Sequence, residues 1–254
     1  MRVTVCQLND QRALFDADWQ ALCAHVKREK SDLVLLPEMP FSHWFATERV
    51  FDQKVWDAAI AAHAAWRPRL LELAPAMVLT AEPAERNGKR LNEAIIWDGG
   101  LAISAHQKRF LPEEEGFWEA TWYERGDGAF DIAVTRDARV GFQICTELWM
   151  LEESRKYGLM GADIIAAPRC TPMSTVERWF IAGRAAAMLS GAFCLSSNHA
   201  GASHAGLTFG GAGWIIDPEG VVMAVTSASE PIVTREIDIE VSRAAKTTYP
   251  RYVS

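Results

Sequence analysis

The sequence lacks the features that mark several large classes of protein. No stretch of about 18 apolar residues occurs, so we expect no transmembrane helix and no contact with a membrane. The N-terminal segment "MRVTVCQLND" has no long apolar run of the signal-peptide type. The net charge is −7, which argues against nucleic acid as a partner. No CxxC or HExxH motif is present, so the sequence gives a metal site little support.

Cysteine is scarce as well, and its five copies have no paired spacing. This usage predicts reduced thiols and a cytoplasmic protein rather than a disulfide framework. Of the chain's 254 residues, 49% are apolar and 23% charged, the composition of a globular protein that can bury a sizeable core.

Apolar strands and amphipathic helices alternate along the whole chain. Helical spacing occurs in residues 17–30, 51–73, 151–161 and 174–191, with an interruption expected near Pro68. The segments "WDGG" and "DPEG" are typical of hairpin turns, and "PIVTREIDIEV" has the pattern of a late strand. No linker rich in Gly, Ser or Pro divides the chain. These observations predict a single α/β domain with two mixed β-sheets and helices outside.

Three polar residues end three apolar strands. Glu38 follows "DLVLLP", Lys108 follows "LAISAHQ" and Cys145 follows "RVGFQI". Ligands of α/β folds gather at strand ends, and a carboxylate, an ammonium and a thiol are suited to acyl transfer. The carboxylate could accept the thiol proton, and the lysine could stabilise a thiolate and then an oxyanion. A helix expected from about Leu148 would favour negative charge at the same place.

Each of these residues also has a structural interpretation. Cys145 could be a small core residue, as we expect for the other four cysteines, Glu38 a solvated strand end and Lys108 a surface charge. A Cys–His hydrolase is a rival class, because it would need a histidine beside Cys145. None of the histidines lies in a suggestive motif, and His106 alternates with Lys108 and so should face the other way. The histidines outside the strand-end segments are His25, His43, His63, His199 and His204.

The strand-end segments resemble a known family. "LLPEM", "QKRFLP" and "ICTELW" are similar to the Glu–Lys–Cys motifs of the nitrilase superfamily, the carbon–nitrogen hydrolases. "GFWEATWYERGD" resembles the segment that carries the family's second glutamate, here Glu119. The resemblance covers almost the entire chain. It implies a four-layer αββα sandwich that forms one domain over residues 1–254. It also implies a homodimer or larger assembly, with a C-terminal tail of ~15 residues available for dimer contacts.

The resemblance also implies a mechanism without a cofactor or metal. Glu38 is expected to act as general base and acid, Cys145 as nucleophile, and Lys108 with the backbone N–H of Thr146 as oxyanion stabilisers. Glu119 would orient Lys108 or water. The implied substrate is a small amide or N-carbamoyl compound. Nitrile hydrolysis and a non-catalytic binding protein on the same fold are the alternatives.

Seven residues near these motifs are candidates for contacts with the substrate. They are His43, Trp44, Trp118, Glu147, Trp149, Arg169 and Met173. Their aromatic members could equally be core fillers. Arg169 has two interpretations. It could pair structurally with Glu147 or another acidic residue, which we favour because Glu147 needs a partner if it is buried. It could instead make a bidentate contact with a substrate carboxylate.

Overall fold

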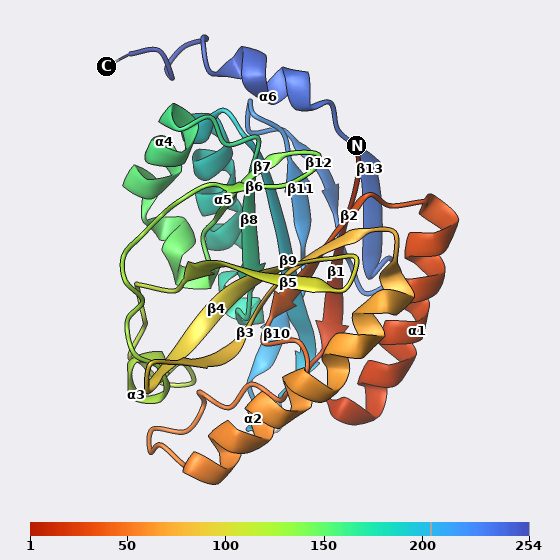
Figure 1. Ribbon diagram of the computed structural model, residues 1–254, viewed down its shortest axis with the longest axis vertical. Helices are drawn as coiled ribbons and strands as arrows, with labels where there is room; N and C mark the ends of the chain where they lie inside the picture. Colours follow the sequence, from red (N-terminus) through yellow and green to blue (C-terminus); the bar gives the residue numbers. More distant parts are fainter. Residues whose placement is uncertain (204, 254) are drawn as a thin grey trace.

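The computed structural model describes residues 1–203 and 205–253, and the chain has an α/β fold in which helices surround a large mixed array of strands (Figure 1). His204 and Ser254, the last residue of the expected tail, lie outside the described residues. No helix in the described part of the chain is long and apolar enough to span a bilayer.

The strands follow the chain in this order: β1 (Arg2–Asn9), β2 (Leu33–Glu38), β3 (Met77–Arg86), β4 (Lys89–Asp98), β5 (Leu101–Gln107), β6 (Ala133–Val134), β7 (Arg139–Phe142), β8 (Ile164–Arg169), β9 (Phe193–Ala202), β10 (Thr208–Gly210), β11 (Trp214–Ile216), β12 (Val222–Val225) and β13 (Ile232–Glu236). The helices are α1 (Arg12–Glu29), α2 (Gln53–Trp66), α3 (Glu119–Trp122), α4 (Leu151–Leu159), α5 (Val176–Ser190) and α6 (Ile239–Ala245), with 3₁₀ turns η1 (Arg67–Leu73), η2 (Cys145–Trp149) and η3 (Met173–Thr175).

Strand β1 joins the two halves of the strand array. Its residues Val3–Val5 pair in parallel with β2, and its residues Gln7–Asn9 pair in parallel with β9. The hydrogen-bonded order is β5-β4-β3-β2-β1-β9-β8-β7-β6. The strands from β3 to β7 in that order are parallel, and antiparallel hairpins flank them. The hairpins predicted at "WDGG" and "DPEG" are confirmed, as β4–β5 and β11–β12.

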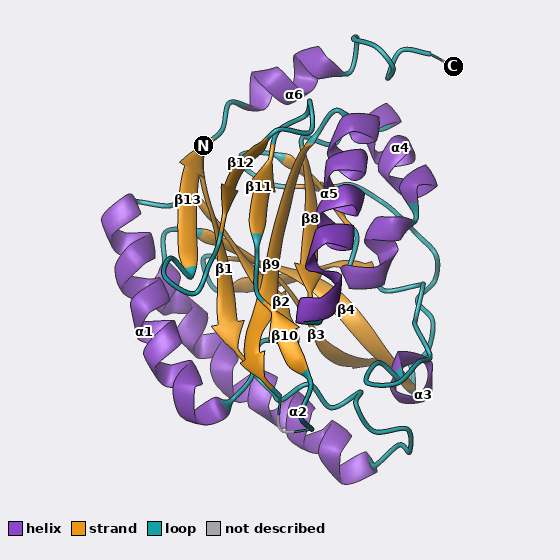
Figure 2. Cartoon of the chain, turned by 180° about the vertical axis from the view of Figure 1, so that it is seen from behind, coloured by secondary structure: helices purple, strands orange, loops and turns teal. Residues whose placement is uncertain are grey.

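Helices cover the strands on two sides. In Figures 1 and 2, α1 and α2 lie together on one side of the strands, and α4 and α5 lie together on the other. Helix α1 buries Trp19, Leu22 and Val26 in a core cluster that includes Val34 and Leu36 of β2. Each such buried side chain contributes about 1.5–3 kcal/mol. Helices on both sides of the strands agree with the prediction that the helices lie outside the sheets. The separation of the molecule into four layers stays a prediction.

Two boundaries differ from the sequence-based expectation. The strand expected over "PIVTREIDIEV" ends at Glu236, because the Asp238 side chain accepts a hydrogen bond from Glu240 N at 3.0 Å and starts α6. The helix expected from about Leu148 is preceded by η2, which begins at Cys145 itself. The interruption expected near Pro68 is confirmed, since α2 ends at Trp66 and continues as a 3₁₀ turn.

Candidate active site

The structure brings the three strand-end residues together. Glu38 is the last residue of β2, Lys108 directly follows β5, and Cys145 opens η2 just after β7. The Lys108 Nζ atom lies 2.8 Å from Glu38 Oε1 and 2.6 Å from Glu119 Oε2, and all three side chains are buried. Asn92 Nδ2 also donates to Glu38 Oε1, at 2.6 Å. The other carboxylate oxygen, Glu38 Oε2, has no hydrogen-bond partner among the described residues.

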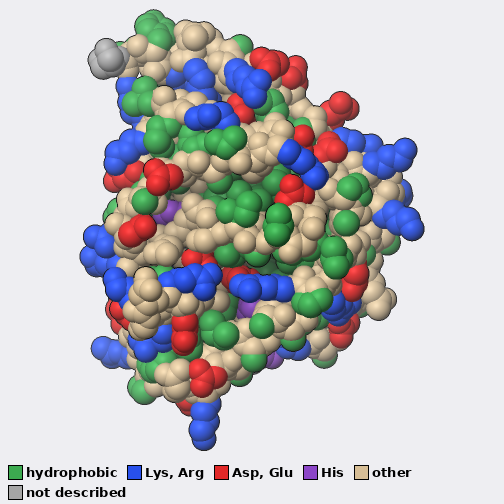
Figure 3. All heavy atoms as spheres, viewed as in Figure 1, with side chains coloured by type: hydrophobic (Ala, Val, Ile, Leu, Met, Phe, Trp, Pro, Cys, Tyr) green, Lys and Arg blue, Asp and Glu red, His purple; other side chains and the backbone are tan. Residues whose placement is uncertain are grey.

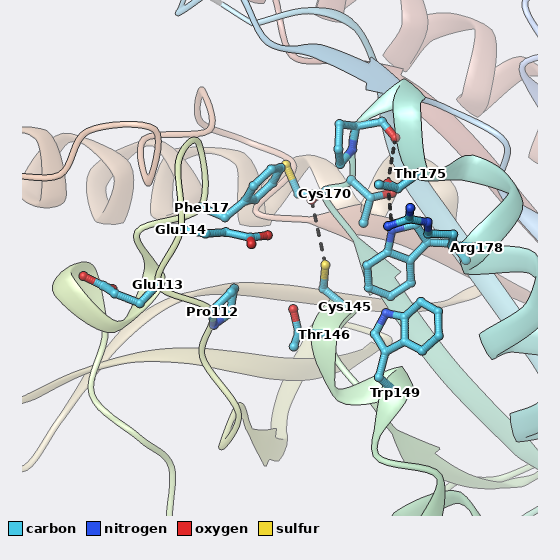
Figure 4. A pocket seen from close by; sticks show the side chains of 13 residues that line it. Pro112, Glu113, Glu114, Phe117, Cys145, Thr146, Trp149, Cys170, Thr175 and Arg178 are labelled. Carbon is cyan, nitrogen blue, oxygen red and sulfur yellow. Dashed lines mark hydrogen bonds between the residues drawn. The ribbon is translucent and has the colours of Figure 1, made fainter.

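Cys145 has a strained backbone. Its φ is +49°, in the left-handed region that non-glycine residues rarely adopt. Strain of this kind costs on the order of 1–3 kcal/mol and is typical of functional sites. The turn places Sγ at a cavity of about 410 Å³ (Figure 4). The Sγ atom lies 3.8 Å from the carbonyl oxygen of Cys170, and the Thr146 N–H has no hydrogen-bond acceptor within residues 1–203 and 205–253.

Burial and the neighbouring charges shift the pKa values of the cluster. Burial raises the pKa of the Cys145 thiol, and Glu38 raises it further, while Lys108 opposes both. Burial lowers the pKa of Lys108, but Glu119 and Glu38 together more than offset this and raise it. Burial raises the pKa of Glu119 above its usual range, against the effect of Lys108. These shifts favour a neutral thiol beside a charged ammonium before the substrate binds.

Glu147 lies behind the nucleophile and holds η2 in place. Its carboxylate accepts hydrogen bonds from Ile144 N at 2.9 Å, from Arg109 N at 2.6 Å and from His106 Nε2 at 2.8 Å. His106 thus contacts the turn that carries Cys145, while Lys108 reaches the two other carboxylates. Burial lowers the pKa of His106, but Glu147 raises it more, so the net shift is upward.

We expect His106→Gln to remove a stabilisation that depends on pH. A histidine with a raised folded pKa stabilises the protein fully below its unfolded pKa of about 6.5, and this contribution fades as the pH rises through the folded value. The variant should therefore be less stable by about 3–5 kcal/mol near pH 6, the scale for breaking a buried pair, and the difference should shrink at higher pH. Urea unfolding at several pH values, with His25→Gln as control, measures this. A difference that does not change with pH would contradict the paired state.

Of the seven residues predicted to contact the substrate, one lines the cavity over Cys145 and six do not. Trp149 lines it together with Cys145 and Thr146. Trp44 is fully buried, and its indole Nε1 donates to the Gly116 carbonyl at 3.0 Å instead. The other candidates, which also lie outside the lining, are His43, Trp118, Glu147, Arg169 and Met173.

The prediction that Arg169 pairs with Glu147 is wrong. Arg169 does not pair with Glu147, whose partners are given above. Its guanidinium donates to Ser196 Oγ at 2.6 Å, to Thr171 Oγ1 at 2.9 Å and to Ala212 O at 2.9 Å. It also lies 3.9 Å from the centre of the Trp214 ring and is 1% exposed. With its donors directed to internal acceptors, Arg169 supports the strand end behind the cavity.

Arg169→Gln should lower stability without changing the preference for substrate charge. The shorter side chain leaves buried acceptors unpaired, at a cost of about 3 kcal/mol in the free energy of unfolding. Losses in kcat/KM should be equal for one acidic and one neutral amide. A KM that rises strongly for the acidic amide alone would restore Arg169 as a carboxylate contact.

Several residues of this site were not identified from the sequence. Asn92 fixes Glu38, and the hydroxyl of Tyr123 is buried without a partner in the described chain. Burial raises the pKa of Tyr123, as do Glu119 and Glu38 nearby. Tyr123 stands four residues after Glu119 in "EATWYERGD", so its place in that motif was the available signal.

Among the described residues, the site has no cluster of metal ligands. Nowhere in the described ranges do three or more His, Cys, Asp or Glu side chains stand where they could hold a metal ion together.

Comparison with known proteins identifies the family of this α/β chain. The carbon-nitrogen hydrolase profile matches residues 2–247, and the chain belongs to that family. A citrullinase of Francisella tularensis is 27% identical over 175 residues, which cover 66% of this chain and 60% of the relative. A nitrilase of Pyrococcus abyssi is 27% identical over 254 residues, 96% of this chain and 92% of the relative.

Solved structures support the fold. The crystal structure of a carbon-nitrogen hydrolase from Helicobacter pylori G27 matches with a TM-score of 0.87 and 22% identity, over 99% of this chain and 94% of that one. At this level of identity the likeness shows the fold alone. The chain spans about 60% of the citrullinase's length.

Proposed function

We propose that this chain hydrolyses non-peptide carbon–nitrogen bonds of amides or N-carbamoyl compounds through a thioester on Cys145. The observation that carries the proposal is the buried Glu38–Lys108–Glu119 cluster, with contacts of 2.8 and 2.6 Å, beside a cysteine in a left-handed turn. An ammonium held between two carboxylates costs desolvation free energy that a structural role alone does not require. The presence of all three reactive groups disfavours a non-catalytic binding protein.

The first half of the reaction forms the thioester. Glu38 accepts the thiol proton through Oε2, which no described residue occupies with a hydrogen bond, and Cys145 Sγ attacks the carbonyl carbon. The oxyanion is stabilised by the Lys108 ammonium and the Thr146 N–H. The carbon–nitrogen bond then breaks, and Glu38 returns the proton to the leaving nitrogen, which departs as ammonia or an amine.

The second half hydrolyses the thioester. Glu38 accepts a proton from water, the hydroxide adds to the thioester carbon, and the carbon–sulfur bond breaks with return of the proton to Cys145. Glu119 keeps Lys108 oriented through both halves by its contact with Nζ. A raised Glu119 pKa limits the negative charge of the buried cluster.

Nitrile hydrolysis is the second candidate. The observation in its favour is the nitrilase relative, whose match covers nearly the whole of both chains. The same thiol could add to a nitrile carbon, but nitrogen would then leave only after water had been added. Parallel assays of an amide and the matching nitrile separate the two.

A panel assay tests the proposed function. Amides, N-carbamoyl amino acids, N-carbamoyl amines and nitriles are incubated with the protein, and ammonia release is measured. Protein whose Cys145 has been alkylated with iodoacetamide is the control. We expect release from at least one amide or N-carbamoyl compound that the control does not give. Absence of release from every compound would contradict the proposal.

We further propose a single domain of two facing sheets between helical layers, working as a homodimer. Apolar side chains gather near the middle of the face seen in Figure 3, among charged ones. Exposed apolar residues also occur on α5, at Ile181 and Met188, and in the C-terminal segment at Tyr249 and Tyr252. Such surface supports a partner copy. Sedimentation of the protein tests the assembly.

A further inference from the structure

Two charged side chains stand on opposite walls of the cavity over Cys145, and neither has a partner among the described residues. Glu114 comes from the loop before α3, and Figure 4 shows its carboxylate directed toward the Cys145 side. Arg178 comes from the first turn of α5 on the far wall, beside Thr175. In the part of the chain that the structure describes, neither side chain makes a hydrogen bond or ion pair. Both side chains are exposed to solvent at the cavity wall, so each can pair with a group of opposite charge on a ligand.

The backbone around Glu114 is fixed. Glu114 and Phe117 exchange backbone hydrogen bonds of 3.3 and 2.8 Å, and the Trp44 indole holds Gly116 between them. The neighbouring Glu113 is different, because its two oxygens accept from Thr121 N at 3.1 Å and Thr121 Oγ1 at 2.7 Å. Of the two acidic side chains that line the cavity, Glu114 is thus the one available to a ligand.

Aromatic side chains line the space between the charges and the nucleophile. Phe117 stands on the Glu114 side, and Trp149 and Trp179 stand on the other, with ring centres 5.5 Å apart. Apolar walls of this kind suit a short methylene chain. The volume of about 410 Å³ lies in the range for small-molecule sites, roughly 300–1,000 Å³.

We propose that the substrate is zwitterionic: an α-amino acid whose side chain ends in a carboxamide or ureido group. The reacting group lies at Cys145, the methylene chain lies against the aromatic walls, the ammonium pairs with Glu114 and the carboxylate pairs with Arg178. This inference rests on the proposed function and adds the substrate class. The reaction is unchanged: one water is consumed, and a ureido group yields the amine and a carbamate, which decomposes to ammonia and carbon dioxide.

Four ureido compounds with matched chains test the charge preference. L-citrulline carries both charges, ureidopentanoate only the carboxylate, N-carbamoylputrescine only the ammonium, and butylurea neither. Charge-assisted hydrogen bonds predict a KM that is lowest for citrulline and rises about tenfold for each missing charge. A KM for butylurea within about twofold of that for citrulline would overturn the proposal.

Single variants assign each charge to its residue. Glu114→Gln should make citrulline and ureidopentanoate equal in KM, and Arg178→Gln should make citrulline and N-carbamoylputrescine equal. The controls are Glu115→Gln and Arg125→Gln, exposed residues outside the lining that should leave the order intact. Variants that lower the rate of all four compounds alike would refute charge recognition by these residues.

A binding measurement separates this inference from the proposed hydrolysis. Each compound is tested for protection of Cys145 against alkylation by iodoacetamide, which requires no turnover. Protection in the order expected above, without ammonia release, supports the charge preference and contradicts the hydrolysis. Ammonia release with equal KM values for the four compounds supports the hydrolysis and contradicts the charge preference. Equal protection by all four compounds also overturns the charge preference.

Discussion

Cys145→Ala is expected to abolish turnover and leave the fold intact. In the proposed reaction the Cys145 thiol forms the covalent intermediate, and loss of a nucleophile costs about 10⁶-fold in kcat in well-studied hydrolases. Alanine and cysteine both carry a Cβ atom, so a φ of +49° costs them a similar conformational free energy and the substitution should not add strain to the turn. Ammonia release from the best substrate, with circular dichroism as a check on folding, measures the effect.

A second buried cysteine provides the matched control. Cys194 in β9 is as buried as Cys145 but lies outside the cavity lining, so Cys194→Ala should lose only stability. Normal turnover by folded Cys145→Ala would contradict the assignment of the nucleophile. An inactive but folded Cys194→Ala protein would contradict it too, because burial rather than chemistry would then be the common cause.

Lys108→Met should be the next most damaging change, with a loss of at least about 100-fold in kcat, the scale for losing one oxyanion donor. Methionine is similar in length but neutral, so the Glu38 and Glu119 carboxylates would face each other without the ammonium between them. Like charges in a buried site raise each other's pKa, and one carboxylate should keep its proton to higher pH.

The pH dependence separates the loss of charge from a loss of folding. A carboxyl group with a raised folded pKa binds more protons in the folded state, so stability falls as the pH rises past the unfolded value near 4.3. The Lys108→Met protein should therefore gain stability at low pH without regaining activity. Lys89→Met, at an exposed position of β4, is the control. Activity that returns together with stability would mean that Lys108 acts only on the fold.

Local patterns were enough to predict much of this molecule. The hairpins at "WDGG" and "DPEG", the break near Pro68 and the strand ends at Glu38, Lys108 and Cys145 each depend on a few neighbouring residues. Strands β2 and β7 belong to the parallel set, and β5, which is antiparallel to β4, runs in the same direction as β3, so all three strands end on the same side. Their catalytic roles remain predictions that the experiments above test.

Pairings between distant segments could not be predicted. Glu147 was expected to meet Arg169, but its partners come from His106 and Arg109, about forty residues earlier in the chain. Trp44 was expected in the pocket because it follows Glu38 closely, yet its indole donates to the Gly116 carbonyl, between Glu114 and Phe117. The availability of Glu114, unlike Glu113, depends on Thr121 and on the turn that Phe117 closes, which no local pattern indicates.

The central claim is a covalent acyl group on Cys145, and peptide mass mapping of protein quenched with acid during turnover tests it most directly. Acid preserves a thioester, and a protein quenched in the steady state should contain part of its chains in acylated form. The account predicts the acyl group on the peptide that contains Cys145 and on none of the peptides with Cys6, Cys23, Cys170 or Cys194. Continued turnover with the acyl group on another cysteine, or with no acylated peptide even in the slowly turning Glu38→Gln variant, would contradict it.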